Sequence, residues 1–140
     1  MGRPPGPSCF VSDDPACALH IFAICYNKRA CGDQHLLIGA DRLRSACGRP
    51  FHTFDGYPIT PSVAGRAALI LDGINQAHPF QDGNKRTSWM CMIYFLARSG
   101  FSLDYESDET AENFVLGLVN HSITTEQATE WIASRLVARP

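Results

Sequence analysis

The segment that most constrains the fold of this chain extends from about Asn84 to Ser99. Apolar side chains would cover nearly the whole circumference of a helix here, and a helix of this kind must be buried. Gly100 follows it and is a typical C-terminal stop. The sequence therefore predicts a body of helices packed around this central one. Its apolar run is Trp89, Met90, Cys91, Met92, Ile93, Tyr94, Phe95, Leu96 and Ala97.

Five further helices are predicted from apolar residues at helical spacing and from residues that suit helix ends. The clearest start is Thr124 with Gln127 three residues later, which is a capping box. The clearest end is His78-Pro79, because a residue before proline avoids the helical region. The five helices are expected at residues 13–31 before Gly32, 36–47, 60–78, 107–119 and 124–136.

One short hairpin is predicted within residues 51–59, where alternating side chains turn at Asp55-Gly56. Its strands are too short to build a sheet, so we interpret it as a flap on a helical body. A chain of 140 residues is expected to form one domain. The predicted fold class is all-α, a single compact bundle of about six helices with a small β-hairpin flap. Residues 1–12, rich in Pro and Gly, are predicted to be a disordered tail, and residues 13–140 the domain.

Charge and hydropathy argue against several classes of function. The formal net charge of −2 gives no electrostatic footprint for direct binding of nucleic acid or of an anionic membrane. No apolar stretch reaches the roughly 18 residues that a membrane span needs. The N-terminus lacks the apolar core of a signal peptide, and the six cysteines include no Cys-x-x-Cys pair. We therefore expect a cytoplasmic protein with free thiols, rather than disulfides or a zinc site.

Chemically versatile residues cluster just before the central helix. The amino end of a buried helix offers free backbone N–H groups and a positive dipole end, which together attract anions. Gly83 lets a phosphate approach the backbone closely, and Lys85 and Arg86 add donors. Asp82 beside phosphates suits Mg²⁺. His78 is the natural general base, because an imidazole exchanges protons near neutral pH.

Each of these residues also has a common structural explanation. A histidine at a helix end can be a cap, a Lys-Arg pair is usually solvated, and Asp-Gly-Asn is an ordinary turn. Their spacing, however, gathers all five features around one point, which favours a phosphate-handling site. Phe80 offers no chemistry and is expected to turn inward as an anchor that orients His78.

The run His78-Pro79-Phe80-Gln81-Asp82-Gly83-Asn84-Lys85-Arg86 resembles the signature of the Fic/Doc superfamily, H-x-F-x-[D/E]-G-N-[G/K]-R. The resemblance covers roughly residues 17–138 and implies the Fic/Doc fold. Residues 95–103 are similar to the stretch that follows the motif in the Doc (death-on-curing) branch. The segment similar to the family's flap is Phe54, Asp55, Gly56, Tyr57 and Pro58.

Two residues make the chain resemble the Doc branch more closely than the Fic branch, whose members transfer AMP. Lys85 stands where Fic enzymes carry Gly, and Trp89 stands where they carry a second Arg that holds nucleotide phosphates. A lysine side chain fills the anion pocket that a glycine leaves open and adds a positive charge to it. Doc proteins resemble small kinases without a kinase fold. The resemblance therefore implies that the γ-phosphate of ATP moves to a threonine of elongation factor Tu, which arrests translation.

The same resemblance assigns a role to each motif residue. His78 would take the proton of the target hydroxyl, and Asp82 would hold Mg²⁺ on the phosphates. The phosphates would be bound by Gly83, Asn84, Lys85 and Arg86. Residues 54–58 would position the target chain by strand pairing. The implied partner is a Phd-like antitoxin, since the family is usually the toxin of a phage- or plasmid-type toxin–antitoxin pair.

Two alternatives stay open from the sequence. A Fic-type enzyme on the same scaffold would transfer AMP to a protein hydroxyl, although Lys85 and Trp89 argue against it. A non-catalytic binding module would keep the fold without the reaction, although His78, Asp82 and Arg86 are all in place. Intact-mass analysis of a treated target separates these outcomes, because phosphate and AMP add different masses.

Overall fold

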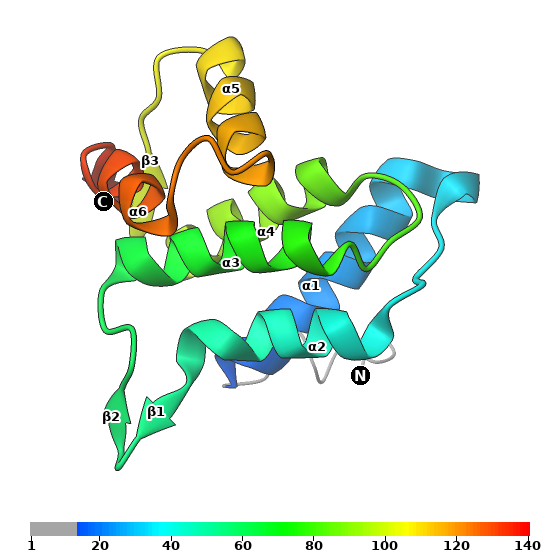
Figure 1. Ribbon diagram of the computed structural model, residues 1–140, viewed down its shortest axis with the longest axis horizontal. Helices are drawn as coiled ribbons and strands as arrows, with labels where there is room; N and C mark the ends of the chain where they lie inside the picture. The colour runs from blue at the N-terminus through cyan, green and yellow to red at the C-terminus, as the bar shows by residue number, and fades with distance from the viewer. Residues whose placement is uncertain (1–13) are drawn as a thin grey trace.

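The computed structural model describes residues 14–140, which form six α-helices (Figure 1). The prediction of an all-α fold is confirmed. The predicted tail, residues 1–12, lies outside the described residues. The helices are α1 (Pro15–Cys31), α2 (Ala40–Gly48), α3 (Val63–Ala77), α4 (Asn84–Arg98), α5 (Asp108–Val119) and α6 (Thr125–Ala133). Short 3₁₀ turns follow α1 and α2, at Gly32–Gln34 and Arg49–Phe51.

Helices α3 and α4 lie side by side at the centre of the molecule (Figure 1). α1 packs on α4, α2 packs on α3 and α1, and α6 packs on α3. Each large apolar side chain buried between them stabilises the fold by roughly 1.5–3 kcal/mol relative to an exposed one. The largest fully buried apolar side chains are Leu19, Leu43, Ile70, Leu71, Ile74, Phe80, Met92, Leu96 and Ile132.

The predicted hairpin is present as β1 (Thr53–Phe54) and β2 (Tyr57–Pro58), which pair in antiparallel register. Its two turn residues, Asp55 and Gly56, have φ angles of 52° and 81°. Two consecutive positive φ angles are what a type I′ turn requires, and Asp-Gly meets that requirement at low cost. The local sequence therefore determines this hairpin.

The last helix is shorter than predicted. α6 begins with the expected capping box of Thr124 and Gln127 but ends at Ala133. Leu136, whose spacing assigned it to the inner face of that helix, instead begins β4 (Leu136–Ala138), which pairs antiparallel with β3 (Phe101–Leu103). A half-buried leucine fits the periodicity of either element, so only the pairing with residues 101–103 decides between them.

The second helix also begins later than predicted. α2 starts at Ala40 rather than at residue 36, because residues 36–39 form an isolated antiparallel bridge, Leu37 to Phe80, and bond to residues 79–81 of the motif. Leu36 is half exposed rather than packed on the inner side of a helix. Tertiary hydrogen bonds here override a helical pattern of leucines.

The third helix begins at Val63 rather than at Thr60-Pro61. Ser62 caps it, since its hydroxyl accepts the N–H of Gly65 at 2.9 Å. Serine is at least as good an N-cap as threonine, so the prediction of Thr60 as the cap was wrong by two residues.

The central helix α4 is not buried all round. Trp89, Ile93 and Tyr94 are only partly buried and pack against the core. The first turn of α4 instead buries polar side chains, Asn84, Thr87 and Ser88. These three buried polar side chains belong to the motif and its immediate continuation, so the site is built into the core.

Five of the six cysteines lie within the described residues. Cys17, Cys25, Cys31, Cys47 and Cys91 are all free thiols. Cys9 lies outside residues 14–140. Burial raises the pKa of the Cys47 thiol to about 12. Within residues 14–140, no helix combines the length and the apolar character that crossing a bilayer needs.

Candidate functional site

His78 lies directly after α3 in the left-handed conformation, with φ 44° and ψ 58°. Its N–H donates to the Ile74 carbonyl at 3.1 Å and completes the helix end. Arg42 of α2 donates from Nε to the Ala77 carbonyl at 2.7 Å and from Nη2 to the His78 carbonyl at 3.2 Å. These bonds satisfy carbonyls that a helix end leaves free, and they fix the backbone that carries the imidazole. Arg42 was not among the predicted site residues, because no local pattern ties it to a histidine so far along the chain.

Asn84 holds the two sides of the motif loop together. Its side chain is 7% exposed, accepts the Phe80 N–H at 3.0 Å and donates to the Phe80 carbonyl at 2.8 Å. The same Nδ2 lies 3.1 Å from Nδ1 of His78 and 3.4 Å from its Nε2. The imidazole, which is exposed, is therefore oriented by a buried amide. Phe80 is fully buried, so it anchors the loop in the core as its apolar character implied.

A non-helical segment, residues 36–39, runs beside the motif loop and forms one antiparallel bridge with it, Leu37 to Phe80. The N–H groups of Ile38 and Gly39 donate to the Pro79 carbonyl at 2.8 and 2.9 Å. In return, the Gln81 N–H donates to the Leu36 carbonyl at 2.9 Å. The exposed side chains of Leu36 and Ile38 therefore lie next to the loop that carries His78. The prediction of a helix over residues 36–47 gave no indication that residues 36–39 lie at the site.

Asp82 and Gly83 form the turn into α4. Gly83 is the N-cap residue with φ 77° and ψ 20°, and its N–H donates to its neighbour's carboxylate, Oδ1 of Asp82, at 2.9 Å. The next amides belong to the first turn of α4 and have no carbonyl within the helix to bind. Lys85 and Arg86 are exposed on that turn. An anion at this position would meet backbone donors, a helix dipole and two cations.

Gly83→Ala is expected to destabilise the protein by about 1–3 kcal/mol, the usual cost of a side chain at a positive φ. A Cβ at Gly83 would also lie 2.7 Å from Sγ of Cys31 and 3.1 Å from Nδ2 of Asn27. Urea denaturation measures the effect. Gly100→Ala is the matched control, because Gly100 has φ 91° but no heavy atom within 4 Å of such a Cβ. An equal loss of stability in the two variants would show that the close packing of Gly83 against Cys31 and Asn27 of α1 adds nothing to the cost.

A hollow of about 540 Å³ opens beside the two cations of the motif. Lys85, Arg86 and Trp89 line it from α4, and α5 forms the opposite wall. Trp89 meets Tyr105 edge to face, with ring centroids 5.4 Å apart. The α5 wall carries two carboxylates, so the hollow is cationic on one side and acidic on the other. Its remaining lining residues are Asp108, Ala111, Glu112, Val115 and Leu116.

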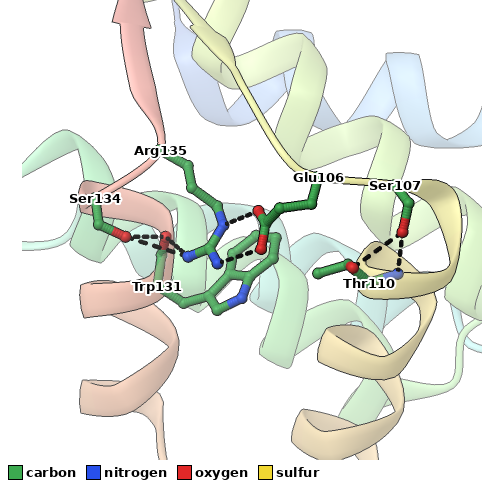
Figure 2. Close-up of polar contacts among 6 residues, drawn as sticks. All are labelled: Glu106, Ser107, Thr110, Trp131, Ser134 and Arg135. Atoms are coloured by element: carbon green, nitrogen blue, oxygen red, sulfur yellow. Dashed lines mark hydrogen bonds and ion pairs between the residues drawn. The ribbon is translucent and has the colours of Figure 1, made fainter.

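A cluster at the C-terminal end of α6 secures the segment that leads into α5 (Figure 2). Arg135 donates from Nε and Nη2 to the two carboxylate oxygens of Glu106, at 2.9 and 3.0 Å. These hydrogen bonds lower the pKa of the Glu106 carboxyl. The guanidinium also lies over the Trp131 ring, 4.1 Å from its centroid. Glu106 follows Tyr105, so this pair fixes one edge of the hollow.

The structure does not bring the predicted flap to the motif loop. The β1–β2 hairpin precedes α3 and the loop follows it, so the two lie at opposite ends of a 15-residue helix (Figure 1). Such a helix is about 22 Å long. Residues 54–58 are exposed, with the rings of Phe54 and Tyr57 largely in solvent. A target-positioning role for them therefore has no support from contact with His78.

Asp82 is the one carboxylate of the motif and therefore its candidate ligand for Mg²⁺. Its carboxylate is exposed, and Oδ1 already accepts the Gly83 N–H. Within residues 14–140, no group of three or more His, Cys, Asp or Glu side chains could form a cage for a metal. One carboxylate suits Mg²⁺, which usually keeps several waters and binds substrate phosphates as well. The residues present therefore fit a magnesium ion that arrives with a nucleotide.

Comparison with known proteins agrees with this geometry. The family model described as "Fic/DOC family" matches residues 14–96. The chain is 31% identical over 96 residues to the protein named Toxin Doc from Mycolicibacterium smegmatis (strain ATCC 700084 / mc(2)155). That alignment covers 67% of this chain and 70% of its relative. No solved structure matches the chain at a comparable level of significance.

A helical fold with an oriented histidine before a helix N-terminus agrees with the class of protein that the family match indicates. The chain belongs to the Fic/DOC family. Its similarity to Toxin Doc, together with Lys85 in the motif, places it in the Doc branch.

Proposed function

We propose that this protein is a Doc-type toxin that transfers the γ-phosphate of ATP to a serine or threonine hydroxyl of a protein. One observation carries the proposal: Asn84 holds the His78 imidazole beside the loop that ends in the Asp82–Gly83 turn. A candidate base and a candidate phosphate site are thereby joined by a single buried side chain. Phosphate transfer depends on a residue that positions and deprotonates the nucleophile and on electrostatic stabilisation of the phosphates.

In the proposed reaction, His78 accepts the proton of the target hydroxyl. The hydroxyl oxygen forms a bond to the γ-phosphorus, the bond from that phosphorus to the β–γ bridging oxygen breaks, and ADP leaves with the electron pair. Mg²⁺ held by Asp82 would neutralise charge on the phosphates. Backbone amides of the α4 N-terminus, with Lys85 and Arg86, stabilise the charge that spreads over the transferred group.

The hollow beside Lys85 suits the remainder of the nucleotide. Trp89 and Tyr105 offer aromatic surface for a base, and a hollow of about 540 Å³ lies within the size range of small-molecule sites. Asp108 and Glu112 on the α5 wall are acceptors for hydroxyl or amino groups. These carboxylates would repel the phosphates of the nucleotide. The phosphates would therefore bind at the α4 N-terminus rather than beside α5.

The target chain is proposed to lie along residues 36–38 rather than along the β1–β2 hairpin. Leu36 and Ile38 are exposed next to the motif loop. Their main chain pairs with residues 79–81 on one side, in the manner of a strand. The main-chain groups of Leu37 that face away from the bridge to Phe80 could recognise an extended peptide with little residue specificity.

Elongation factor Tu in the bacterial cytoplasm is the proposed target, and a Phd-like antitoxin is the proposed partner. Both follow from the Doc resemblance, and the relative's name supports the toxin assignment. The purified protein, incubated with elongation factor Tu and ATP labelled at the γ position, is expected to transfer the label. ATP labelled at the α position is expected to leave the target unlabelled, and intact mass should show the gain of one phosphate. A gain of one AMP would support the Fic-type alternative instead.

A further inference from the structure

Asn27 is a polar residue on the core face of α1. It follows Leu19 and Ala23 at four-residue spacing, and each of the three is at most 1% exposed. A buried amide destabilises a fold unless its hydrogen-bonding groups have partners. The partners of Asn27 therefore show why an amide stands where the helix pattern calls for an apolar side chain.

The side chain of Asn27 is bonded at every polar atom. Nδ2 donates to the main-chain carbonyl of Asp82 at 2.9 Å and to Oγ1 of Thr87 at 3.1 Å. Oδ1 lies 2.7 Å from Nδ1 of His35. A carbonyl oxygen can only accept, so Nδ2 must face Asp82 and Oδ1 must face His35. His35 therefore donates from Nδ1, and this donor keeps the amide in one orientation.

The Asn27 amide thus ties α1 to both sides of the phosphate turn. The bond to the Asp82 carbonyl fixes the peptide between Asp82 and Gly83, and the bond to Thr87 fixes the first turn of α4. The Asp82 carboxylate and the left-handed Gly83 are set by that peptide, because Oδ1 of Asp82 accepts the Gly83 N–H at 2.9 Å. Neither Asn27 nor His35 lines the hollow beside Lys85.

We propose that Asn27, oriented by His35, is a positioning residue for the phosphate transfer. This inference rests on the proposed function, because it gives the Asp82–Gly83 turn its importance. Asn27 and His35 touch neither nucleotide nor target. They aim the Asp82 carboxylate and the α4 amides at the point where the phosphates bind. Groups that orient a metal ligand in this way typically change metal affinity or activity by 10–100-fold when they are removed.

Hydrogen–deuterium exchange without ligand tests the positioning role independently of activity. Asn27→Ala and His35→Ala are expected to speed exchange of amides in residues 82–87 by about fivefold or more, the factor that one ordinary hydrogen bond represents. Amides of α5 should exchange at wild-type rates, which separates a loosened turn from a destabilised fold. His35→Asn is the matched control, because an asparagine amide can present a donor at the position of Nδ1. Unchanged exchange of residues 82–87 in both alanine variants would overturn the inference.

Kinetics then connect the turn to the reaction. In His35→Ala, the Mg²⁺ concentration for half-maximal transfer is expected to rise about 10–100-fold, and His35→Asn should restore most of the loss. If Asn27→Ala does not fold, the two His35 variants carry the same comparison. If amides of residues 82–87 exchange faster in His35→Ala but the Mg²⁺ concentration for half-maximal transfer is unchanged, the positioning role is overturned. Absence of transfer by the wild-type protein would instead refute the proposed function. The exchange experiment would then still show whether Asn27 and His35 hold the Asp82–Gly83 turn in place.

Discussion

Replacement of His78 by asparagine is expected to lower phosphate transfer by about 10²–10⁴-fold, the usual contribution of a general base. The loss should fall on kcat, since the α4 N-terminus and its cations still bind the nucleotide. Expression of the variant should no longer arrest growth. Both effects follow because no other imidazole is held beside the Asp82–Gly83 turn by Asn84. Transfer of γ-labelled phosphate and growth after induction measure them.

Asparagine is a better replacement at this position than alanine. His78 has φ 44°, a left-handed conformation that asparagine tolerates and that costs alanine roughly 1–2 kcal/mol. His78→Ala should abolish activity as well, with a somewhat lower Tm. Asn84 keeps both bonds to Phe80 in either variant, so the loop should stay closed.

The chain provides a matched control for His78→Asn. His121 is also exposed and also has a positive φ, 65°, but it follows α5, is not part of the motif and does not line the hollow beside Lys85. His121→Asn should therefore leave transfer and growth arrest at wild-type levels. Growth arrest that persists in His78→Asn would remove His78 from the role of base and would favour the non-catalytic binding module.

Local sequence was sufficient for those parts of the molecule that local chemistry determines. The capping box at Thr124, the Asp55-Gly56 turn and the end of α3 before Pro79 all follow from one or two residues. The position of the motif at a helix N-terminus could also be predicted, because the turn residue Gly83 and the helix after it are adjacent in the chain. The inward position of Phe80 follows from the same adjacency, since a lone phenyl ring in a polar loop has only the core to enter.

What the sequence could not provide are the contacts between distant segments. Arg42 and Asn27 hold the motif from helices far earlier in the chain, and no spacing rule connects them to it. Asn27 did leave one signal, a lone polar residue on an otherwise apolar helical face. Residues 36–39 and 136–138 continue helical patterns of leucines, yet main-chain pairing with residues 79–81 and 101–103 keeps both segments out of the helices. The position of the β1–β2 hairpin depends on the direction of α3, which the local turn chemistry does not determine.

The identity of the transferred group is expected to depend on Lys85. Its side chain is exposed at the first turn of α4, forms no ion pair with another described residue and lines the hollow. Removing one donor of a charge-stabilising site typically costs about 10²–10³-fold in rate. Lys85→Gly should therefore weaken phosphate transfer by about that factor. The vacated space and lost charge should also allow AMP transfer, detectable with ATP labelled at the α position.

Two further replacements separate the volume of Lys85 from its charge. Lys85→Met keeps most of the side chain without the ammonium group, so phosphate transfer should fall while AMP transfer stays absent. Lys85→Ala opens the space without the added backbone freedom of glycine, which costs a helix about 1 kcal/mol, and it should behave like Lys85→Gly. If all three variants transfer phosphate at the wild-type rate, Lys85 does not contact the moving group. The choice between phosphate and AMP would then rest on Trp89, which lines the hollow at the position where Fic-type enzymes are expected to place an arginine.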